Sequence, residues 1–158
     1  MPWLNTTAEV MEILGDNMNV IALDVGTKTI GVAKGRTETE ITQPLLTLKR
    51  KSVKKDVRQL LSICQEHGIE QIVVGLPLEL DGVEGRSARL ARQVGDGLQA
   101  ISGLPLAYQD ERYSTVEAER RLRIAGRSAH DMKSVIDQVA AMVILEDWLA
   151  GLKPKRST

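Results

Sequence analysis

Four acidic residues stand at places in the sequence where a carboxylate is costly unless it has a partner. Asp24 follows the apolar run 20–23, Asp110 and Glu111 end a second short run, and Asp137 lies beside the apolar stripe of a helical segment. A buried carboxylate is unfavourable unless it is ion-paired, hydrogen-bonded or bound to a metal. Mg²⁺ and Mn²⁺ prefer carboxylate oxygens, and two such ions about 4 Å apart can stabilise both reacting oxygens in phosphodiester hydrolysis. These residue types therefore predict metal-assisted phosphodiester chemistry if the fold brings the acids together.

Each acid also has a purely structural explanation. Asp24 can cap a hairpin turn, and Asp110 and Glu111 can serve a turn or the start of a helix. A surface ion pair is the more common explanation for a helical acid such as Asp137. The functional interpretation therefore depends on the elements that carry these residues.

Apolar periodicity and turn residues predict nine main elements. We expect strands at 20–25, 30–33, 45–48, 72–74 and 104–109, and helices at 53–66, 90–101, from 114 and from 128 to about 150. This order predicts an α/β fold with a mixed five-stranded sheet, in which three antiparallel strands are extended by two parallel strands and flanked by helices. Ligands of such sheets bind beyond the carboxyl ends of the strands. Asp24, the loop 75–81 and the pair Asp110 and Glu111 should therefore meet at one edge.

Length and composition indicate one globular domain. We expect a domain at 19–151, an extension at 1–18 and a basic tail at 152–158. No apolar stretch approaches the roughly 20 residues that span a bilayer, and the first twenty residues carry acids but no basic residue, unlike a targeting segment. The single cysteine, Cys64, lies on the apolar stripe of a predicted helix, which favours a buried thiol and a reducing cytoplasm.

Other chemistries have little support in the sequence. It has no glycine-rich dinucleotide turn and no Walker A lysine, and its histidines, His67 and His130, lie on no metal-ligand spacing. The turn 24–27 permits one rival, a nucleotide phosphate held by backbone amides, as in sugar kinases and heat-shock ATPases. That class needs a second lobe, for which 158 residues leave no room.

The formal net charge is zero, but the basic residues are unevenly placed. They gather in 49–58 and in 112–133. Solvated helix faces are the simpler explanation, and binding of phosphate groups is the alternative.

The sequence resembles the YqgF/RuvX family from about residue 19 to residue 149. The resemblance rests on four ordered motifs: ALDVGTKTIGVA at 22–33, VGLPL at 74–78 with DG at 81–82, DER at 110–112 with ST at 114–115, and ID at 136–137 with AA at 140–141. The family is described both as Holliday junction resolvases and as nucleases that mature the 5′ end of pre-16S ribosomal RNA. The resemblance therefore implies an RNase H-like fold and a metal-dependent hydrolase acting on phosphodiester bonds.

The resemblance also implies a set of site residues. The catalytic residues would be Asp24, Asp110, Glu111 and Asp137, of which Asp24, Glu111 and Asp137 would bind Mg²⁺ or Mn²⁺, while Lys28 and Arg112 would contact the scissile phosphate. Glu79 and Val83 depart from the family pattern, which has asparagine and a threonine-like residue at these positions.

Three functions stay open at this point. RNA is the favoured substrate, with ribosomal precursor particles as a partner and a monomer or homodimer as the active form. Four-way DNA is the alternative substrate, and a non-catalytic nucleic-acid-binding factor is the third interpretation.

Overall fold

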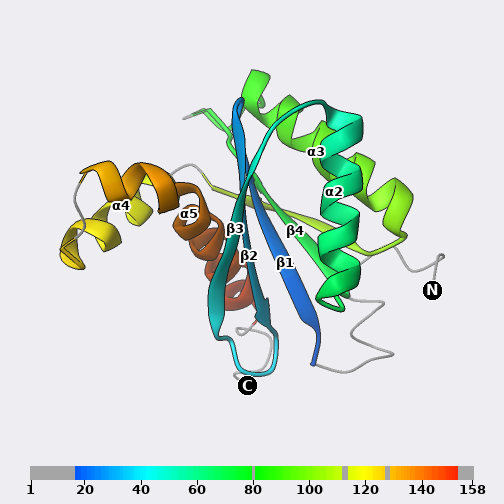
Figure 1. Ribbon diagram of the computed structural model, residues 1–158, viewed down its shortest axis with the longest axis horizontal. Helices are drawn as coiled ribbons and strands as arrows, with labels where there is room; N and C mark the ends of the chain where they lie inside the picture. Colours follow the sequence, from blue (N-terminus) through cyan, green and yellow to red (C-terminus); the bar gives the residue numbers. More distant parts are fainter. Residues whose placement is uncertain (1–16, 80, 112–113, 127–128, 153–158) are drawn as a thin grey trace.

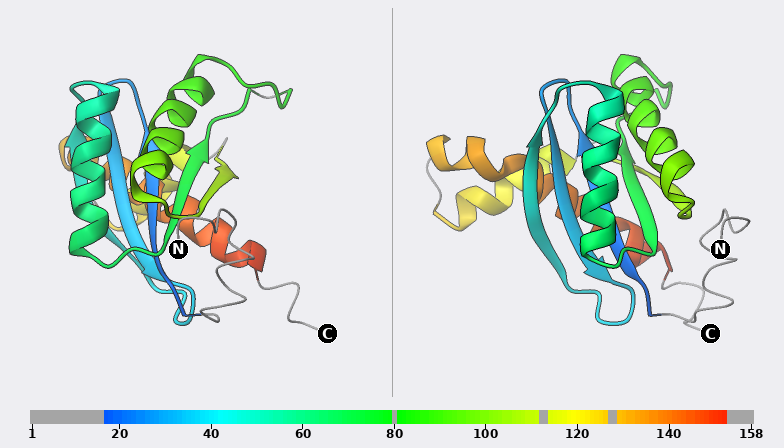
Figure 2. Two further views of the ribbon diagram at one scale, coloured as in Figure 1. Left: turned by 90° about the vertical axis from the view of Figure 1, so that its right-hand side faces the viewer. Right: turned by 45° about the vertical axis from the view of Figure 1, so that its right-hand side comes forward.

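The structure, a computed structural model, describes residues 17–79, 81–111, 114–126 and 129–152. Its elements are β1 Asn19–Val25, β2 Thr29–Arg36, β3 Thr42–Lys49, α2 Val53–Glu66, β4 Gln71–Leu76, α3 Arg86–Ser102, β5 Leu106–Asp110, α4 Ser114–Ile124 and α5 Ala129–Leu152. The sheet lies between two helical layers, with α2 and α3 on one face and α5, joined by α4, on the other (Figure 1, Figure 2). The expected order of elements is confirmed.

The sheet has the strand order β3-β2-β1-β4-β5. β1 pairs antiparallel with β2 and β2 with β3, whereas β1 with β4 and β4 with β5 are parallel. The predicted mixed five-stranded sheet is therefore confirmed, with β1 at its centre.

Strands β3 and β4 are among those that are longer than the sequence pattern predicts. β3 begins at Thr42, before Pro44, because an edge strand tolerates a residue without a backbone N–H, and the pairing there shifts between Val32 and Ala33. β4 continues through Gly75 to Leu76, although Gly75 was expected to end it. The parallel pairing with β5 extends to the same point and keeps these residues in the sheet.

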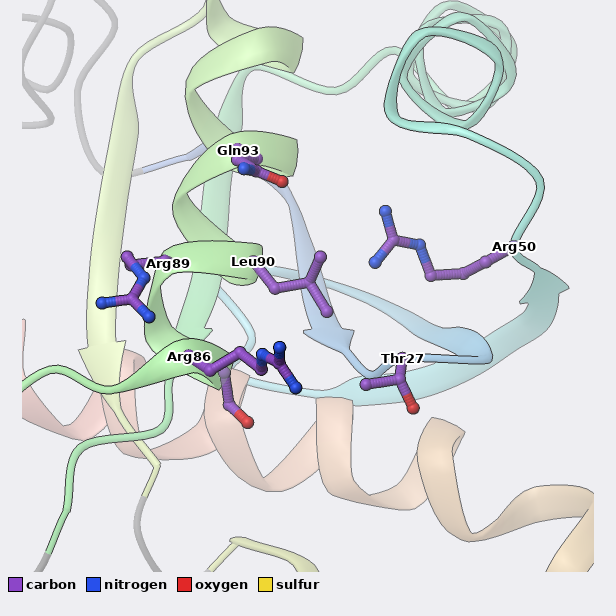
Figure 3. A pocket seen from close by; sticks show the side chains of 7 residues that line it. Thr27, Arg50, Arg86, Arg89, Leu90 and Gln93 are labelled. Atoms are coloured by element: carbon purple, nitrogen blue, oxygen red, sulfur yellow. The ribbon is translucent and has the colours of Figure 1, made fainter.

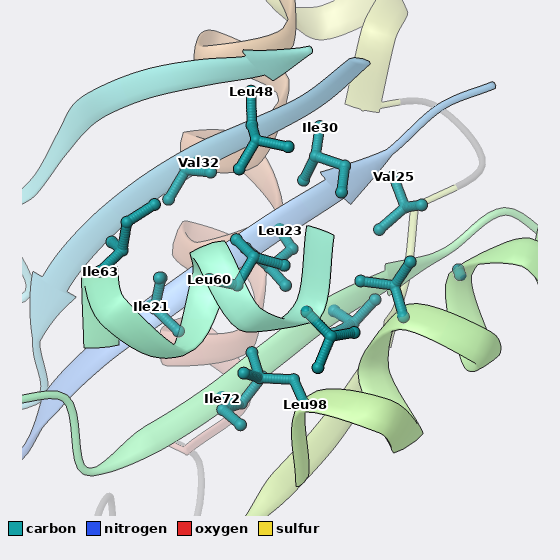
Figure 4. Close-up of a cluster of buried hydrophobic side chains, with 14 of the residues drawn as sticks. Ile21, Leu23, Val25, Ile30, Val32, Leu48, Leu60, Ile63, Ile72 and Leu98 are labelled. Atoms are coloured by element: carbon teal, nitrogen blue, oxygen red, sulfur yellow. The ribbon is translucent and has the colours of Figure 1, made fainter. Parts of the chain in front are cut away.

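Alternation along β1 divides its side chains between two cores. Ile21, Leu23 and Val25 enter the cluster beneath α2 and α3 (Figure 4), whereas Val20 and Ala22 enter the cluster beneath α5. Successive side chains of a strand point to opposite faces. Asp24 therefore faces α5.

Cys64 lies on the inner side of α2 and is buried, as expected. Burial raises the pKa of its thiol to about 12, which keeps the thiol protonated near neutral pH. The buried Cys64 is therefore a packing residue.

Helix α5 buries a wider face than the sequence predicts. The apolar spacing predicts a stripe that includes Val135, Ile136, Val139, Ala140 and Val143; the last two are buried as predicted, whereas the first three are only partly buried. Ile144 and Trp148, on the same side as Asp137, are also buried against the sheet. The helix contacts all five strands, so more than one narrow stripe is covered.

Among the described helices, none combines the length and apolar character needed to cross a membrane.

Gly31 in β2 sets the distance between α5 and the sheet. A Cβ atom added to it would lie 2.0 Å from the carbonyl oxygen of Asp137. Since this neighbour is helix backbone, the contact cannot be relieved by a side-chain rotation, and α5 would have to move.

We expect Gly31→Ala to lower the free energy of unfolding by about 1–3 kcal/mol, the usual range for overpacking, as measured by urea denaturation. Gly151→Ala in the last turn of α5 is the control, because a Cβ there meets nothing within 4 Å. That control should be neutral or stabilising by up to about 1 kcal/mol. Equal effects of the two variants would contradict the close-approach argument.

Candidate functional site

Three acids from separate elements meet between the sheet and α5. Asp24 comes from β1, Glu111 follows β5, and Asp137 belongs to α5. The pKa of Asp24 is raised well above its usual value of 3.8, first by burial and then by the negative charges of Glu111 and Asp137. Such an effect of one charge on another falls with distance, so the three carboxylates are near neighbours.

The register of β4 and β5 determines which acid enters this site. Asp110 pairs with Leu76 at the end of β5, and the backbone N–H of Glu111 donates to the carbonyl oxygen of Leu76 at 3.2 Å. The Glu111 side chain is buried, whereas Asp110 is exposed. Asp110 is also absent from the charges that shift Asp24. The structure thus brings Glu111, and not Asp110, to Asp24.

Gly75 provides the space that Glu111 occupies. A Cβ atom on Gly75 would lie 2.9 Å from the carboxyl carbon of Glu111 and 2.5 Å from Cδ1 of Ile144. Gly75 follows Val74, which points to the α2 and α3 face, so Gly75 presents its missing side chain to α5. Glu111 therefore lies directly over the strand.

Asp137 is held by β2. The hydroxyl of Thr29 donates to Oδ2 of Asp137 at 2.5 Å, and Gly31 lies against the Asp137 backbone. Sequence reasoning did not assign a role to Thr29, Gly31 or Gly75. Gly31, inside the strand predicted at 30–33, was the available indication, because a glycine within a strand often marks close approach of another segment.

The donor chemistry of the three acids suits a hard cation. Carboxylate oxygens are the ligands that Mg²⁺ and Mn²⁺ prefer. The raised pKa of Asp24 reflects its burial and, after that, the nearby charges of Glu111 and Asp137, and a bound cation would offset both. No group of three or more His, Cys, Asp or Glu side chains among the described residues stands in a ligating arrangement. The fit therefore rests on the donor types and on their mutual electrostatic effect.

Of the two cationic residues predicted to contact the scissile phosphate, the structure describes only Lys28. Lys28 is exposed at the turn between β1 and β2, where its carbonyl oxygen accepts a hydrogen bond from the Arg50 backbone N–H at 2.9 Å. Arg112 lies outside the described residues.

The side chain of Glu79 is exposed. It lies near the start of α3, because a Cβ atom added to Gly85 would be 2.7 Å from its Oε1. Its charge is not among those that shift Asp24.

Comparison with known proteins identifies the family of this chain. The family model described as "RuvX: Holliday junction resolvase" matches residues 18–151. A relative from Myxococcus xanthus (strain DK1622), described as "Putative pre-16S rRNA nuclease", is 42% identical over 137 residues, covering 87% of this chain and 91% of the relative. A relative from Cereibacter sphaeroides (strain ATCC 17025 / ATH 2.4.3) with the same description is 44% identical over 136 residues, covering 82% and 85%.

Solved structures support the fold. The T. thermophilus RuvC in complex with a Holliday junction substrate aligns with a TM-score of 0.54 at 16% identity, covering 85% of this chain and 96% of that chain. The fowlpox virus resolvase, in complex with Holliday junction DNA, aligns with a TM-score of 0.55 at 9% identity, covering 86% and 99%. The predicted RNase H-like fold is thereby confirmed. With a family model matching 18–151 and relatives above 40% identity over most of the sequence, this chain belongs to the RuvX family.

Proposed function

We propose that this chain is a metal-dependent nuclease that hydrolyses phosphodiester bonds in the 5′-end processing of pre-16S ribosomal RNA. The observation that supports the chemistry is the convergence of Asp24, Glu111 and Asp137 from three elements, with their charges close enough to raise the pKa of Asp24. The relatives described as pre-16S rRNA nucleases support the choice of substrate.

The chain's own residues position the reaction. Asp24, Glu111 and Asp137 would supply the oxygen ligands, and the Thr29 hydroxyl holds one of the two carboxylate oxygens of Asp137 in place. Mg²⁺ or Mn²⁺, when bound, would activate water and stabilise the leaving oxygen. Lys28, exposed at the adjacent turn, and Arg112 are proposed to contact the scissile phosphate, where fixed cations stabilise developing charge.

The setting of this activity is part of the proposal. The domain 19–151 would act in the cytoplasm on ribosomal precursor particles, as a monomer or a homodimer. Residues 1–18 and 152–158 would lie outside the catalytic domain, although Met18 itself is buried beneath α5.

Asp24→Asn and Asp137→Asn should each reduce cleavage of a pre-16S RNA fragment in Mg²⁺ by at least about a hundredfold, because loss of even outer-shell partners of a metal ligand costs about 10–100-fold. Asp147→Asn, on the exposed side of α5, is the matched control and should cleave normally. Normal cleavage by Asp24→Asn would contradict the assignment of Asp24 as a catalytic metal ligand. Binding of RNA without cleavage in any divalent metal would instead favour a non-catalytic binding factor.

The raised pKa of Asp24 gives a second prediction, which needs no activity assay. The folded protein binds this proton more tightly than the unfolded chain, so the corresponding stability is present below pH 3.8 and is lost as the pH rises through the raised pKa. In EDTA at pH 7, Asp24→Asn should therefore have a higher Tm than the wild type, by about 2–4 °C for each kcal/mol relieved.

The same comparison at a pH below 3.8 is the control, because Asp24 is then protonated in both states and the difference should vanish. Adding Mn²⁺ at pH 7 should raise the Tm of the wild type but not of Asp24→Asn. A lower Tm for the variant in EDTA at pH 7 would contradict the cost of burying the Asp24 charge beside two other carboxylates.

The family description supports a second candidate function, resolution of four-way DNA junctions. The same acids and metal would perform that hydrolysis. Cleavage of a pre-16S RNA fragment and of a four-way DNA junction, measured side by side under one condition, separates the two. We expect the RNA to be cut faster, and paired incisions in the junction with intact RNA would reverse the assignment.

A further inference from the structure

A basic pocket lies on the opposite side of the β1–β2 turn from the acids. It has a volume of about 420 Å³ and forms between this turn, the end of β3 and the first turns of α3 (Figure 3). Three arginines line it, together with the polar side chains of Thr27, Ser87 and Gln93. Arg50 and Arg86 extend toward the same space from opposite sides, with Thr27 at its edge. Among the described residues that line it, none is acidic.

Arg50 is held in a fixed position in this pocket. Its Nε donates to Oδ2 of the buried Asp56 at 3.0 Å, and its Nη1 donates to the carbonyl oxygen of Gly26 at 3.1 Å. The Arg50 side chain is only 10% exposed. Asp56 compensates the charge of Arg50, so this arginine mainly gives the pocket a rigid wall and a defined set of donors.

Arg86 and Arg89 provide positive charge without a protein partner. Both are exposed, and neither forms an ion pair or a side-chain hydrogen bond with any residue in the described part of the chain. By contrast Arg92, one turn further along α3, is paired with Glu84 at 2.6 Å. The pocket therefore carries two charges that are free to bind an anion. An arginine fork matches the geometry of a phosphate group, to which it can donate two parallel hydrogen bonds.

The start of α3 adds to this preference. Gly85 is its N-cap and supplies no side-chain hydrogen bond, and the first turn contains no acidic residue. Backbone N–H groups at a helix N-terminus favour anions. Glu79 is the acid beside Gly85, but it lies outside the pocket lining.

One tight turn connects the pocket with the acids. The Gly26 backbone N–H donates to the Thr29 carbonyl oxygen at 2.8 Å, which closes the turn. Thr29 then bonds Asp137 on one side, whereas Thr27 lines the pocket on the other. A strand crossing this turn would meet the acids and the arginines in succession.

We propose that this pocket binds a second phosphate group of the nucleic-acid strand whose scissile phosphate lies at Asp24, Glu111 and Asp137. The proposal rests on the proposed nuclease function and deepens it, because it assigns Arg86, with Thr27 and Arg50, to positioning the strand. The phosphate is either an internal phosphodiester or the 5′-terminal phosphate of the strand.

The test measures binding of single-stranded RNA oligonucleotides to the full chain in EDTA by fluorescence anisotropy. Arg86→Gln should weaken binding about tenfold, as expected for loss of a charge-assisted hydrogen bond, and should lower the salt slope of log affinity by about 0.7. Arg58→Gln is the matched control, because Arg58 is exposed on α2 and lines neither site. It should leave the affinity and its salt slope unchanged.

Oligonucleotides with one methylphosphonate linkage then locate the contact. In the wild type, neutralising one particular linkage should weaken binding, and this penalty should disappear in Arg86→Gln while penalties at other linkages persist. If removal of the 5′-terminal phosphate has this effect instead, the pocket holds the strand end.

Equal penalties at every linkage in the wild type and Arg86→Gln, with RNA bound, would overturn the pocket assignment but leave the nuclease proposal standing. Absence of RNA binding by the wild type would overturn both proposals.

Discussion

Helix α5 can cross the sheet at short range only where the strands lack side chains. Gly31 lies against the Asp137 backbone, and Gly75 lies under Glu111. Because of these two glycines, carboxylates from α5 and from the end of β5 enter the same narrow layer as Asp24. Burial and mutual repulsion there raise the pKa of Asp24, so the packing that completes the fold also crowds negative charge. A divalent cation would relieve this cost, which links the stability of the layer to the proposed chemistry.

Much of the fold follows from local sequence patterns. The apolar residues of β1 and the apolar spacing of α2 predict those elements, since both are buried along their length or along one face. The predicted start of β3 was wrong, because the strand was expected to begin only after Pro44. Proline is tolerated in an edge strand, and β3 is an edge strand only because of the strand order, which the local sequence does not show. The buried face of α5 was predicted only in part: Ala140 and Val143 are buried as predicted, but a helix that contacts every strand is covered over a wider arc than one apolar stripe.

The site was only partly predictable. Asp24 and Asp137 stand out because each is an acid next to apolar residues that must be buried. The sequence kept both Asp110 and Glu111 as catalytic candidates. Adjacent residues at a strand end point in different directions, and which of them faces Asp24 depends on the register of β5 with β4. Thr29 reaches Asp137 across 108 residues of sequence, and no local pattern predicts such a contact.

The β1–β2 turn joins these observations, because its two sides differ in charge. Thr29 faces the acids, while Thr27 and the Gly26 carbonyl oxygen face Arg50 and the basic pocket. A polyanion is repelled by bare carboxylates and attracted by arginines, so the pocket would hold the strand while a cation makes the acids accessible to it. The buried ion pair with Asp56 holds the Arg50 side chain in place, and Arg50 also donates a hydrogen bond to the β1–β2 turn. A strand bound in the pocket would therefore be positioned by a rigid part of the protein that leads directly to Asp24.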